Sequence, residues 1–308
     1  MKQQLLKILV CPECKSELTC TVKEKEFNEI KEGNLHCKKC SLDYAIKSFI
    51  PRFVETDAYV DNFSFEWHTH RSTQLDSQTG TKESTENFKR ITGFDLNDLV
   101  GKLVLDSGCG SGRYSEVAAN AGAEVVAIDL SFAVDAAWTN LGKRKNVHIL
   151  QADIFKLPFR NETFDYIFSL GVLHHTPDCK GAFMHLPPLL KKEGKISIFV
   201  YSKKAHFLAT DVLRVATTRM DKKHLYSLCR TVVEPVYTLT KIPLIGFPFR
   251  AFISTHPSKE WRALDTFDWY SPKYQSKHSH DEVVAWFTEA GLTEIKKLDF
   301  PTAVTGRK

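Results

Sequence analysis

Two pairs of cysteines lie near the start of the sequence. They form Cys11-Pro-Glu-Cys14 and Cys37-Lys-Lys-Cys40. Two C-x2-C pairs supply four thiolates at the vertices of a tetrahedron, which is the coordination that zinc prefers. Because four protein ligands leave no position for water, we expect a structural zinc that takes no part in catalysis. A pair of disulfides is the weaker alternative in a chain that we expect to be cytosolic.

Acidic residues and glycines farther along the chain are suited to binding a nucleoside. Asp106, Gly108 and Gly110 directly follow the apolar run 103–105. Glycines at this spacing let the backbone turn tightly and approach a ligand at the start of the next helix. Asp129 ends the next apolar run, where a carboxylate can accept hydrogen bonds from both hydroxyls of a ribose. The pattern predicts a nucleoside cofactor site.

One position argues against a dinucleotide as this cofactor. A dinucleotide fingerprint that begins at Gly108 requires Gly or Ala at position 113, where the chain has Arg113. An arginine at that close contact between helix and strand disfavours NAD and FAD.

The elements that must position these residues alternate in type. Between residues 102 and 203, apolar runs alternate with helical patterns, which predicts βαβ units and a parallel sheet. Ligands of such sheets bind at the carboxyl ends of the strands. We therefore expect an α/β fold with a doubly wound sheet.

The glycine motif and three later segments resemble class I S-adenosylmethionine-dependent methyltransferases over about residues 90–202. The form D-x-G-C-G-x-G matches motif I, and the segments 150–159, 164–175 and 194–200 are similar to the third, fourth and fifth strands of that family. The resemblance implies a Rossmann-like domain that binds S-adenosyl-L-methionine. It assigns Asp106, Gly108 and Gly110 to the methionine moiety, Asp129 to the ribose, Asp153 and Ile154 to the adenine, and Ser169 and Leu170 to the reacting sulfonium.

The cysteine region also resembles a known family over about the first 53 residues. LLKILVCPECKSEL and HCKKCSLDYAI are similar to the zinc ribbon whose stand-alone members activate tRNA and protein methyltransferases by covering an apolar face of the catalytic subunit. The resemblance implies the same supporting role within one chain. We expect the segments 5–10 and 44–51 to be strands that cross the metal site. A nucleic-acid-binding ribbon is the competing interpretation, but ten Lys/Arg against eight Asp/Glu in residues 1–55 give it a small electrostatic footprint.

Two adjacent histidines follow the predicted fourth strand. Methyl transfer to a hydroxyl or an acidic carbon requires a base, and His174 or His175 stands where ligands bind. A structural role for both is the alternative. The sequence lacks the Asn/Asp-Pro-Pro-Tyr/Phe signature of enzymes that methylate planar nitrogens. These observations favour O- or C-methylation.

A basic insertion follows the predicted fifth strand. Residues 203–262 hold eleven Lys/Arg against four Asp/Glu, a net charge of +7 in a chain of net charge +5. We expect a helical cap over an anionic, amphiphilic or lipid-linked small-molecule acceptor, although a solvated basic face is the simpler interpretation. The segment 268–272, Asp-Trp-Tyr-Ser-Pro, is expected to form a loop that walls the acceptor pocket. Residues 63–67 and 71–74 are expected to form an N-terminal lid.

The sequence thus predicts four regions. They are a zinc ribbon (1–55), a cofactor-binding domain (56–202), a basic helical cap (203–265) and a C-terminal helix and strands that complete the sheet (266–308). No secretory leader is recognisable, and three prolines interrupt the long apolar tract 232–253, so we expect a cytoplasmic protein without a membrane span and with at most a peripheral membrane contact. The rival functions are an rRNA methyltransferase and a non-catalytic cofactor-binding scaffold.

Overall fold

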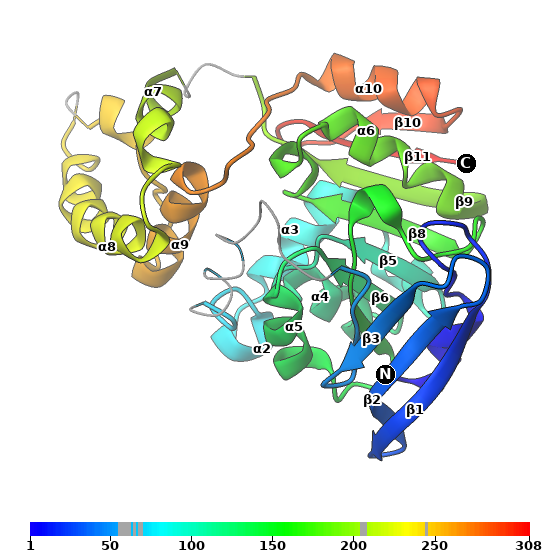
Figure 1. Ribbon diagram of the computed structural model, residues 1–308. Coiled ribbons are helices and arrows are strands. Elements are labelled where there is room, and N and C mark those ends of the chain that lie inside the picture. Colours follow the sequence, from blue (N-terminus) through cyan, green and yellow to red (C-terminus); the bar gives the residue numbers. More distant parts are fainter. Residues whose placement is uncertain (55–62, 64–65, 67–69, 204–207, 244–245) are drawn as a thin grey trace.

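The computed structural model describes residues 1–54, 63, 66, 70–203, 208–243 and 246–308. The described chain forms a small antiparallel sheet, a larger mixed sheet flanked by helices, and a lobe of helices beside it (Figure 1). The predicted α/β class, with an N-terminal ribbon and a helical cap, is confirmed.

The N-terminal sheet has the strand order β1-β2-β3-β4. Its strands are β1 (Leu18–Glu26), β2 (Glu29–Cys37), β3 (Asp43–Lys47) and β4 (Ile50–Pro51). The prediction of a strand over residues 5–10 is wrong, because Gln3–Lys7 is the 3-10 helix η1 and only Leu9 and Val10 form isolated bridges. The turn of η1 buries Leu5, and Leu9, which follows the turn, packs in the same core.

The larger sheet has the strand order β10-β11-β9-β8-β5-β6-β7. Its strands are β5 (Leu103–Ser107), β6 (Glu124–Asp129), β7 (Val147–Gln151), β8 (Phe164–Leu170), β9 (Leu190–Phe199), β10 (Thr293–Lys297) and β11 (Ala303–Arg307). Strands β5 to β9 are parallel, and β11 is antiparallel to both neighbours. The strand order reverses between β5 and β8, which places a ligand-binding crevice at the carboxyl ends of these strands.

Helices and the ribbon cover the two faces of this sheet. Side chains of α3 (Glu83–Thr92), α4 (Arg113–Asn120) and α5 (Ala133–Leu141) share one core with one face. Side chains of α6 (Cys179–Met184), α10 (His280–Glu289) and the ribbon share a second core with the other face. The remaining short elements are α2 (Asp76–Thr79), η2 (Leu96–Leu99), η3 (Ile154–Lys156), η4 (Leu173–His175) and η5 (Pro187–Leu189).

The ribbon occupies the place of a helix on the sheet. The connection from β7 to β8 contains only η3, and ribbon residues such as Leu9 and Phe53 share a core with Leu150 of β7. The Phe53 amide donates a hydrogen bond to the carbonyl of Gln151, 2.8 Å away, at the end of β7. The Phe49 ring stacks on Trp138 of α5 at 4.8 Å. The ribbon and the sheet therefore share apolar surface that each would otherwise expose.

The cap forms a helical lobe with a small core of its own. It comprises α7 (Leu208–Thr217), α8 (Lys222–Leu239), η6 (Pro248–Ala251) and α9 (Lys259–Tyr270). Figure 1 shows this lobe beside the carboxyl ends of the sheet strands. The predicted boundary at residue 265 falls inside α9, and the boundary at residue 56 lies outside the described residues. None of the described helices combines the length and the apolar character needed to cross a bilayer.

Candidate functional site

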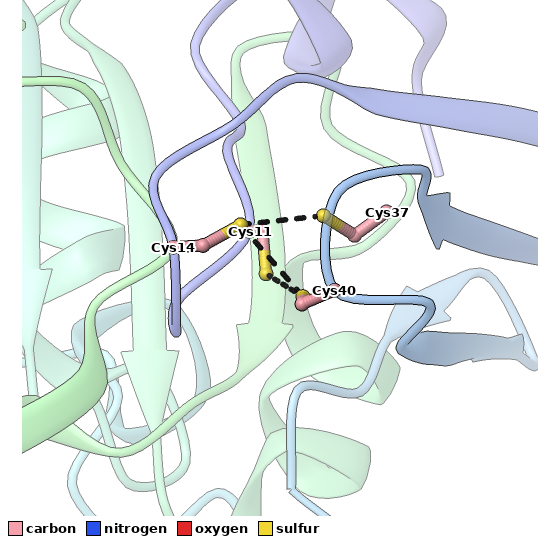
Figure 2. Close-up of side chains that lie close together, drawn as sticks. All are labelled: Cys11, Cys14, Cys37 and Cys40. Atoms are coloured by element: carbon pink, nitrogen blue, oxygen red, sulfur yellow. Dashed lines mark hydrogen bonds between the residues drawn. The ribbon is translucent and has the colours of Figure 1, made fainter.

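The four predicted zinc ligands converge in the ribbon. Cys11, Cys14, Cys37 and Cys40 place their sulfurs within 4.8 Å of one another (Figure 2). The Sγ–Sγ distances are 3.5 Å for Cys11–Cys40, 3.4 Å for Cys14–Cys37 and 3.7 Å for Cys14–Cys40. A tetrahedron with zinc–sulfur bonds of about 2.3 Å has edges of about 3.8 Å, so the donor set fits zinc.

The cysteine knuckles also touch the larger sheet. The Val10 amide donates to the carbonyl of Pro158 at 2.9 Å, and Lys15 Nζ donates to the carbonyl of Leu157 at 2.7 Å. Lys156 pairs with Glu13 at 2.6 Å. These hydrogen bonds and this ion pair hold the first cysteine pair against the loop that leads from β7 to β8.

A cavity of about 440 Å³ lies at the crevice between the strand ends and the cap. The glycine loop, the carboxyl ends of β6, β7 and β8, and α9 contribute to its walls. Seven predicted site residues line it: Gly108, Gly110, Asp129, Asp153, Ile154, Leu170 and His175. The fold therefore brings residues from four separate segments to one site.

The glycine loop after β5 needs residues without a Cβ. Gly108 has a φ of +92°, and a Cβ on it would lie 2.3 Å from Val172 Cγ1. Gly112, with a φ of +94°, would meet Leu141 Cδ1 at 2.7 Å. These contacts explain why glycine is required at both positions.

Two carboxylates stand at the ends of neighbouring strands. Asp129 Oδ2 accepts a hydrogen bond from the Gly110 amide at 2.9 Å, and its Oδ1 accepts one from the Ser131 amide at 2.8 Å. Asp153 Oδ1 accepts one from the Phe155 amide at 2.9 Å. Burial raises the pKa of Asp129 above its ordinary value. The Asp129 carboxylate thus ties the end of β6 to the glycine loop.

Three predicted site residues lie behind the cavity wall. Asp106 is buried and accepts a hydrogen bond from Ser115 Oγ at 2.6 Å, and burial raises its pKa to about 7. Ser169 Oγ donates to the carbonyl of Ser107 at 2.7 Å. His174 is fully buried, and its ring stacks on Tyr201 at 3.8 Å. Whether these three residues serve the cofactor or acceptor stays a prediction.

His175 is the histidine of the pair that faces the cavity. Its Nδ1 lies 3.0 Å from the carbonyl of Tyr274, so this nitrogen carries the proton and Nε2 keeps its lone pair. Nε2 lies 4.0 Å from Asp268 Oδ1. Burial lowers the pKa of His175. The imidazole is therefore neutral at pH 7 and able to accept a proton.

Three acidic residues to which no individual role was assigned from the sequence also line the cavity, two of them in segments that were expected to form its wall (268–272) and its lid (63–67). They are Glu66, Asp265 and Asp268. Burial raises the pKa of Asp265 to about 7, and burial followed by the nearby Asp268 raises that of Glu66 well above its ordinary value. For Asp265 and Asp268, their spacing of three residues, which places them on one face of a helix, was a usable signal.

Two of the expected pocket walls differ in part from the structure. The predicted loop over residues 268–272 is wrong for its first part, because α9 continues through Tyr270 after starting at the Ser258 cap. Asp268 and Trp269 nevertheless line the cavity. Of the expected lid, Phe63, Glu66 and Gln74 line the cavity, while residues 64, 65 and 67 lie outside the described residues.

Comparison with known proteins assigns both regions to families. Residues 105–198 match the family described as "Methyltransferase domain", and residues 2–48 match the family described as "Trm112p-like protein". The chain carries a methyltransferase domain behind a Trm112p-like domain. The glycine loop and the strands β6 to β8 that form the cavity all lie within the methyltransferase domain.

Individual relatives cover only part of the chain. The human protein named "Probable tRNA methyltransferase 9B" is 27% identical over 152 residues, 47% of this chain and 32% of the relative. The Coxiella burnetii ubiquinone biosynthesis O-methyltransferase is 31% identical over 163 residues, 52% of this chain and 60% of the relative. The chain thus spans less than two thirds of either relative. A complex that contains the Haloferax volcanii Trm112 methyltransferase activator matches with 14% identity, covering 80% of this chain and 97% of that chain at a TM-score of 0.47.

The cavity of the methyltransferase domain fits S-adenosylmethionine. Ile128, Leu130 and Ile154 supply apolar walls beside the carboxylates of Asp129 and Asp153, as a purine nucleoside requires. Its volume of about 440 Å³ lies within the range of sites for molecules of this size.

Proposed function

We propose that the protein is an S-adenosylmethionine-dependent methyltransferase that acts on a small molecule held between the strand ends and the cap. The observation that carries this proposal is one continuous cavity, whose walls come from the glycine loop, Asp129 and Asp153 on one side and from α9 on the other. A cofactor and an acceptor bound there would be neighbours.

The bound cofactor supplies an activated methyl group on a sulfonium. In our proposal Asp129 holds the ribose, Asp153 and Ile154 hold the adenine edge, and Gly108 and Gly110 admit the methionine moiety. His175 Nε2 accepts the proton that the acceptor loses. Tyr201 and Trp269 line the cavity beside it and help to exclude water. The protein's main contribution is orientation of the two reactants.

The cysteine cluster supports a proposal of one structural zinc. All four ligands are protein thiolates, so the coordination sphere is closed. The ribbon then stabilises the methyltransferase domain by covering one face of its sheet, and the metal does no chemistry.

A nucleoside in RNA is the second candidate acceptor. It is favoured by the similarity to a protein named as a tRNA methyltransferase and by the Trm112p-like domain. Incubation with S-adenosyl-[methyl-³H]methionine and either a total tRNA and rRNA fraction or a small-molecule extract would separate the two, because label would enter only one fraction.

Cofactor binding is testable without knowing the acceptor. We expect Asp129→Ala to weaken S-adenosylhomocysteine binding by about 1.5 to 3 kcal/mol, the range for a hydrogen bond to a charged group. Calorimetry measures this, with Asp98→Ala in the exposed turn η2 as the control. Wild-type affinity in a folded Asp129→Ala protein would show that the cofactor lies elsewhere, and no binding by the wild-type protein would refute the proposed function.

A further inference from the structure

Five buried side-chain atoms of residues that line the cavity have no hydrogen-bond partner among the described residues. Two of them, Ser107 Oγ and Arg113 Nη2, belong to the side of the glycine loop and α4. The other three are acceptors that lie together on the side of α9 and His175. They are Glu66 Oε2, His175 Nε2 and Asp268 Oδ1. The residues Glu66 and His175 are 3% and 4% exposed, and all three residues line the cavity. A buried polar atom without a partner costs about 1 to 3 kcal/mol, so such atoms mark the place where a ligand supplies the missing partner.

Neighbouring groups leave these atoms able to accept. The His175 Nδ1 proton is donated to the carbonyl of Tyr274, which leaves the lone pair on Nε2. The Tyr201 hydroxyl donates to Asp268 Oδ2 at 2.9 Å, which leaves Oδ1 available. A ligand that fits must therefore bring hydrogen-bond donors.

The charges of the residues that line the α9 side of the cavity also favour a ligand that brings hydrogen-bond donors. Asp265 lines the cavity one helical turn before Asp268, so two carboxylates from α9 accompany Glu66. Among the described lining residues, Arg113 is the only Lys or Arg. Its Nε donates to Ser84 Oγ at 2.9 Å, whereas its Nη2 has no hydrogen-bond partner in the described part of the chain. Because burial raises the pKa of Glu66 and of Asp265, these acids ionise most readily when a cation lies beside them. In a water-poor cavity they therefore favour a cationic reacting group over an anionic one.

We propose that the methyl acceptor is an amine, which enters this cavity as an ammonium ion. This proposal rests on the proposed methyltransferase function and deepens it by naming the acceptor class. A primary ammonium carries three N–H donors, which match Glu66 Oε2, His175 Nε2 and Asp268 Oδ1. A hydroxyl brings one donor and leaves two of the three atoms unpaired. The proposal departs from the O- or C-methylation expected from the sequence, which stays the alternative that the experiments below distinguish.

The same residues support the transfer. One ammonium proton passes to His175 Nε2, and Asp268 Oδ1, 4.0 Å away, stabilises the imidazolium that forms. The freed nitrogen lone pair makes the bond to the methyl carbon as the bond from sulfur to that carbon breaks, and its electron pair remains on sulfur. The product is a methylated ammonium and a neutral thioether. The carboxylate of Glu66 offsets the positive charge that the nitrogen keeps.

A binding experiment tests the ammonium site directly. The melting temperature of the S-adenosylhomocysteine complex is measured with methylammonium chloride and with equal concentrations of potassium chloride. We expect methylammonium to stabilise the wild-type complex, and we expect Glu66→Gln and Asp268→Asn each to weaken its apparent affinity by about tenfold, as for a lost charged hydrogen bond. Asp281→Asn, an exposed acid on α10, is the matched control and should bind like wild type.

A methyl-transfer assay provides a second test of the proposal. Pairs that differ only in the reacting group, hexylamine against hexanol and glucosamine against glucose, are incubated with enzyme and S-adenosyl-[methyl-³H]methionine. Label in the amine alone supports the proposal, and label in the alcohol alone overturns it. Where neither member reacts, the binding arm decides.

The outcomes separate this proposal from the function on which it rests. If methylammonium gives no more stabilisation than potassium, or if both variants retain it, the amine site is refuted while S-adenosylhomocysteine binding stands. If the variants instead lose about tenfold in S-adenosylhomocysteine affinity, the carboxylates hold the amino group of the cofactor and the proposal is also overturned. Failure of the wild-type protein to bind S-adenosylhomocysteine would refute the methyltransferase function itself.

Discussion

Asp265 shows how one residue couples the site to the stability of the fold. Its carboxylate accepts a hydrogen bond from Ser254 Oγ at 3.0 Å, yet burial raises its pKa to about 7 from an ordinary value of 3.8. The folded protein therefore holds this proton more tightly than the unfolded chain does. As the pH rises from about 4 to about 7, the unfolded chain loses the proton first, so the contribution of Asp265 to stability falls.

We predict that Asp265→Asn raises the free energy of unfolding at pH 8 by roughly 2 kcal/mol and leaves it nearly unchanged at pH 4. The amide keeps the shape of the carboxyl group and removes the cost of ionising it in the cavity. Urea unfolding of the ligand-free protein at the two pH values measures the difference, and Asp98→Asn in η2 is an exposed control. An equal effect of Asp265→Asn at both pH values would contradict this explanation.

Residues that belong to a local motif were accessible from the sequence, and residues placed by the tertiary fold were not. Gly108, Asp129 and Asp153 each sit next to a predicted strand end, and the structure places all three on the cavity. Glu66 lies within the lid predicted for residues 63–67 and lines the cavity, but no motif marked its carboxylate as a site residue. His174 and His175 look equivalent in the sequence. Their difference arises because the packing of η4 buries one and turns the other toward the cavity.

At the scale of elements, the ribbon covers part of one face of the larger sheet, where a helix would otherwise pack. The apolar runs of β5 to β9 were recognisable because strands buried on both faces are continuously apolar. The segment 5–10 was mistaken for a strand because a short apolar run does not distinguish a strand from a helical turn. The structure of segment 5–10 depends on the face of the larger sheet against which it packs. That face is formed by residues far along the chain, so the sequence of the ribbon alone does not reveal it.

We predict that Cys37→Ser destabilises the whole protein and not the ribbon alone. Loss of a ligand should reduce bound zinc from one per chain and lower the free energy of unfolding by roughly 3 kcal/mol or more, since structural zinc sites contribute strongly to folding. Because the ribbon and the sheet share one core, calorimetry should show a single unfolding transition at a lower temperature.

The control for this prediction is Cys20→Ser, which changes a cysteine of β1 that lies outside the metal cluster. It should keep one zinc per chain and lose little stability. Two separate transitions in Cys37→Ser, with the upper one at the wild-type temperature, would mean that the ribbon folds independently of the methyltransferase domain.

At the scale of the molecule, opposite charges are separated in space. The charged residues that line the cavity are mostly acidic, whereas the sequence of residues 203–262, most of which form the cap, has a net charge of +7. Arg230 and Lys259 of the cap line a separate groove of about 350 Å³ with the hydroxyls of Ser227 and Thr231. The positive potential of this groove would attract an acceptor that carries an anionic group besides its amine.

The last prediction concerns this basic groove. We expect the double change Arg230→Glu and Lys259→Glu to raise the Michaelis constant of an acceptor that carries an anionic group and to leave the affinity for S-adenosylhomocysteine unchanged. The reason is that a local positive potential concentrates an anion near the protein and speeds its association. Salt limits the reach of this potential to about 8 Å at physiological ionic strength, so added salt should raise the Michaelis constant of the wild-type enzyme more than that of the variant.

The matched control reverses the same amount of charge elsewhere. Lys143 and Lys145 are exposed and lie just before the amino end of β7, away from the cap at the carboxyl ends of the strands. The double change Lys143→Glu and Lys145→Glu therefore alters the net charge equally but leaves the cap intact. Comparing 2-aminoethyl phosphate with ethanolamine isolates the anionic group, because both carry the same amine. If the two double variants shift the Michaelis constant for 2-aminoethyl phosphate equally, the effect comes from net charge. The basic groove is then a solvated surface, and recognition of the acceptor is confined to the acidic cavity.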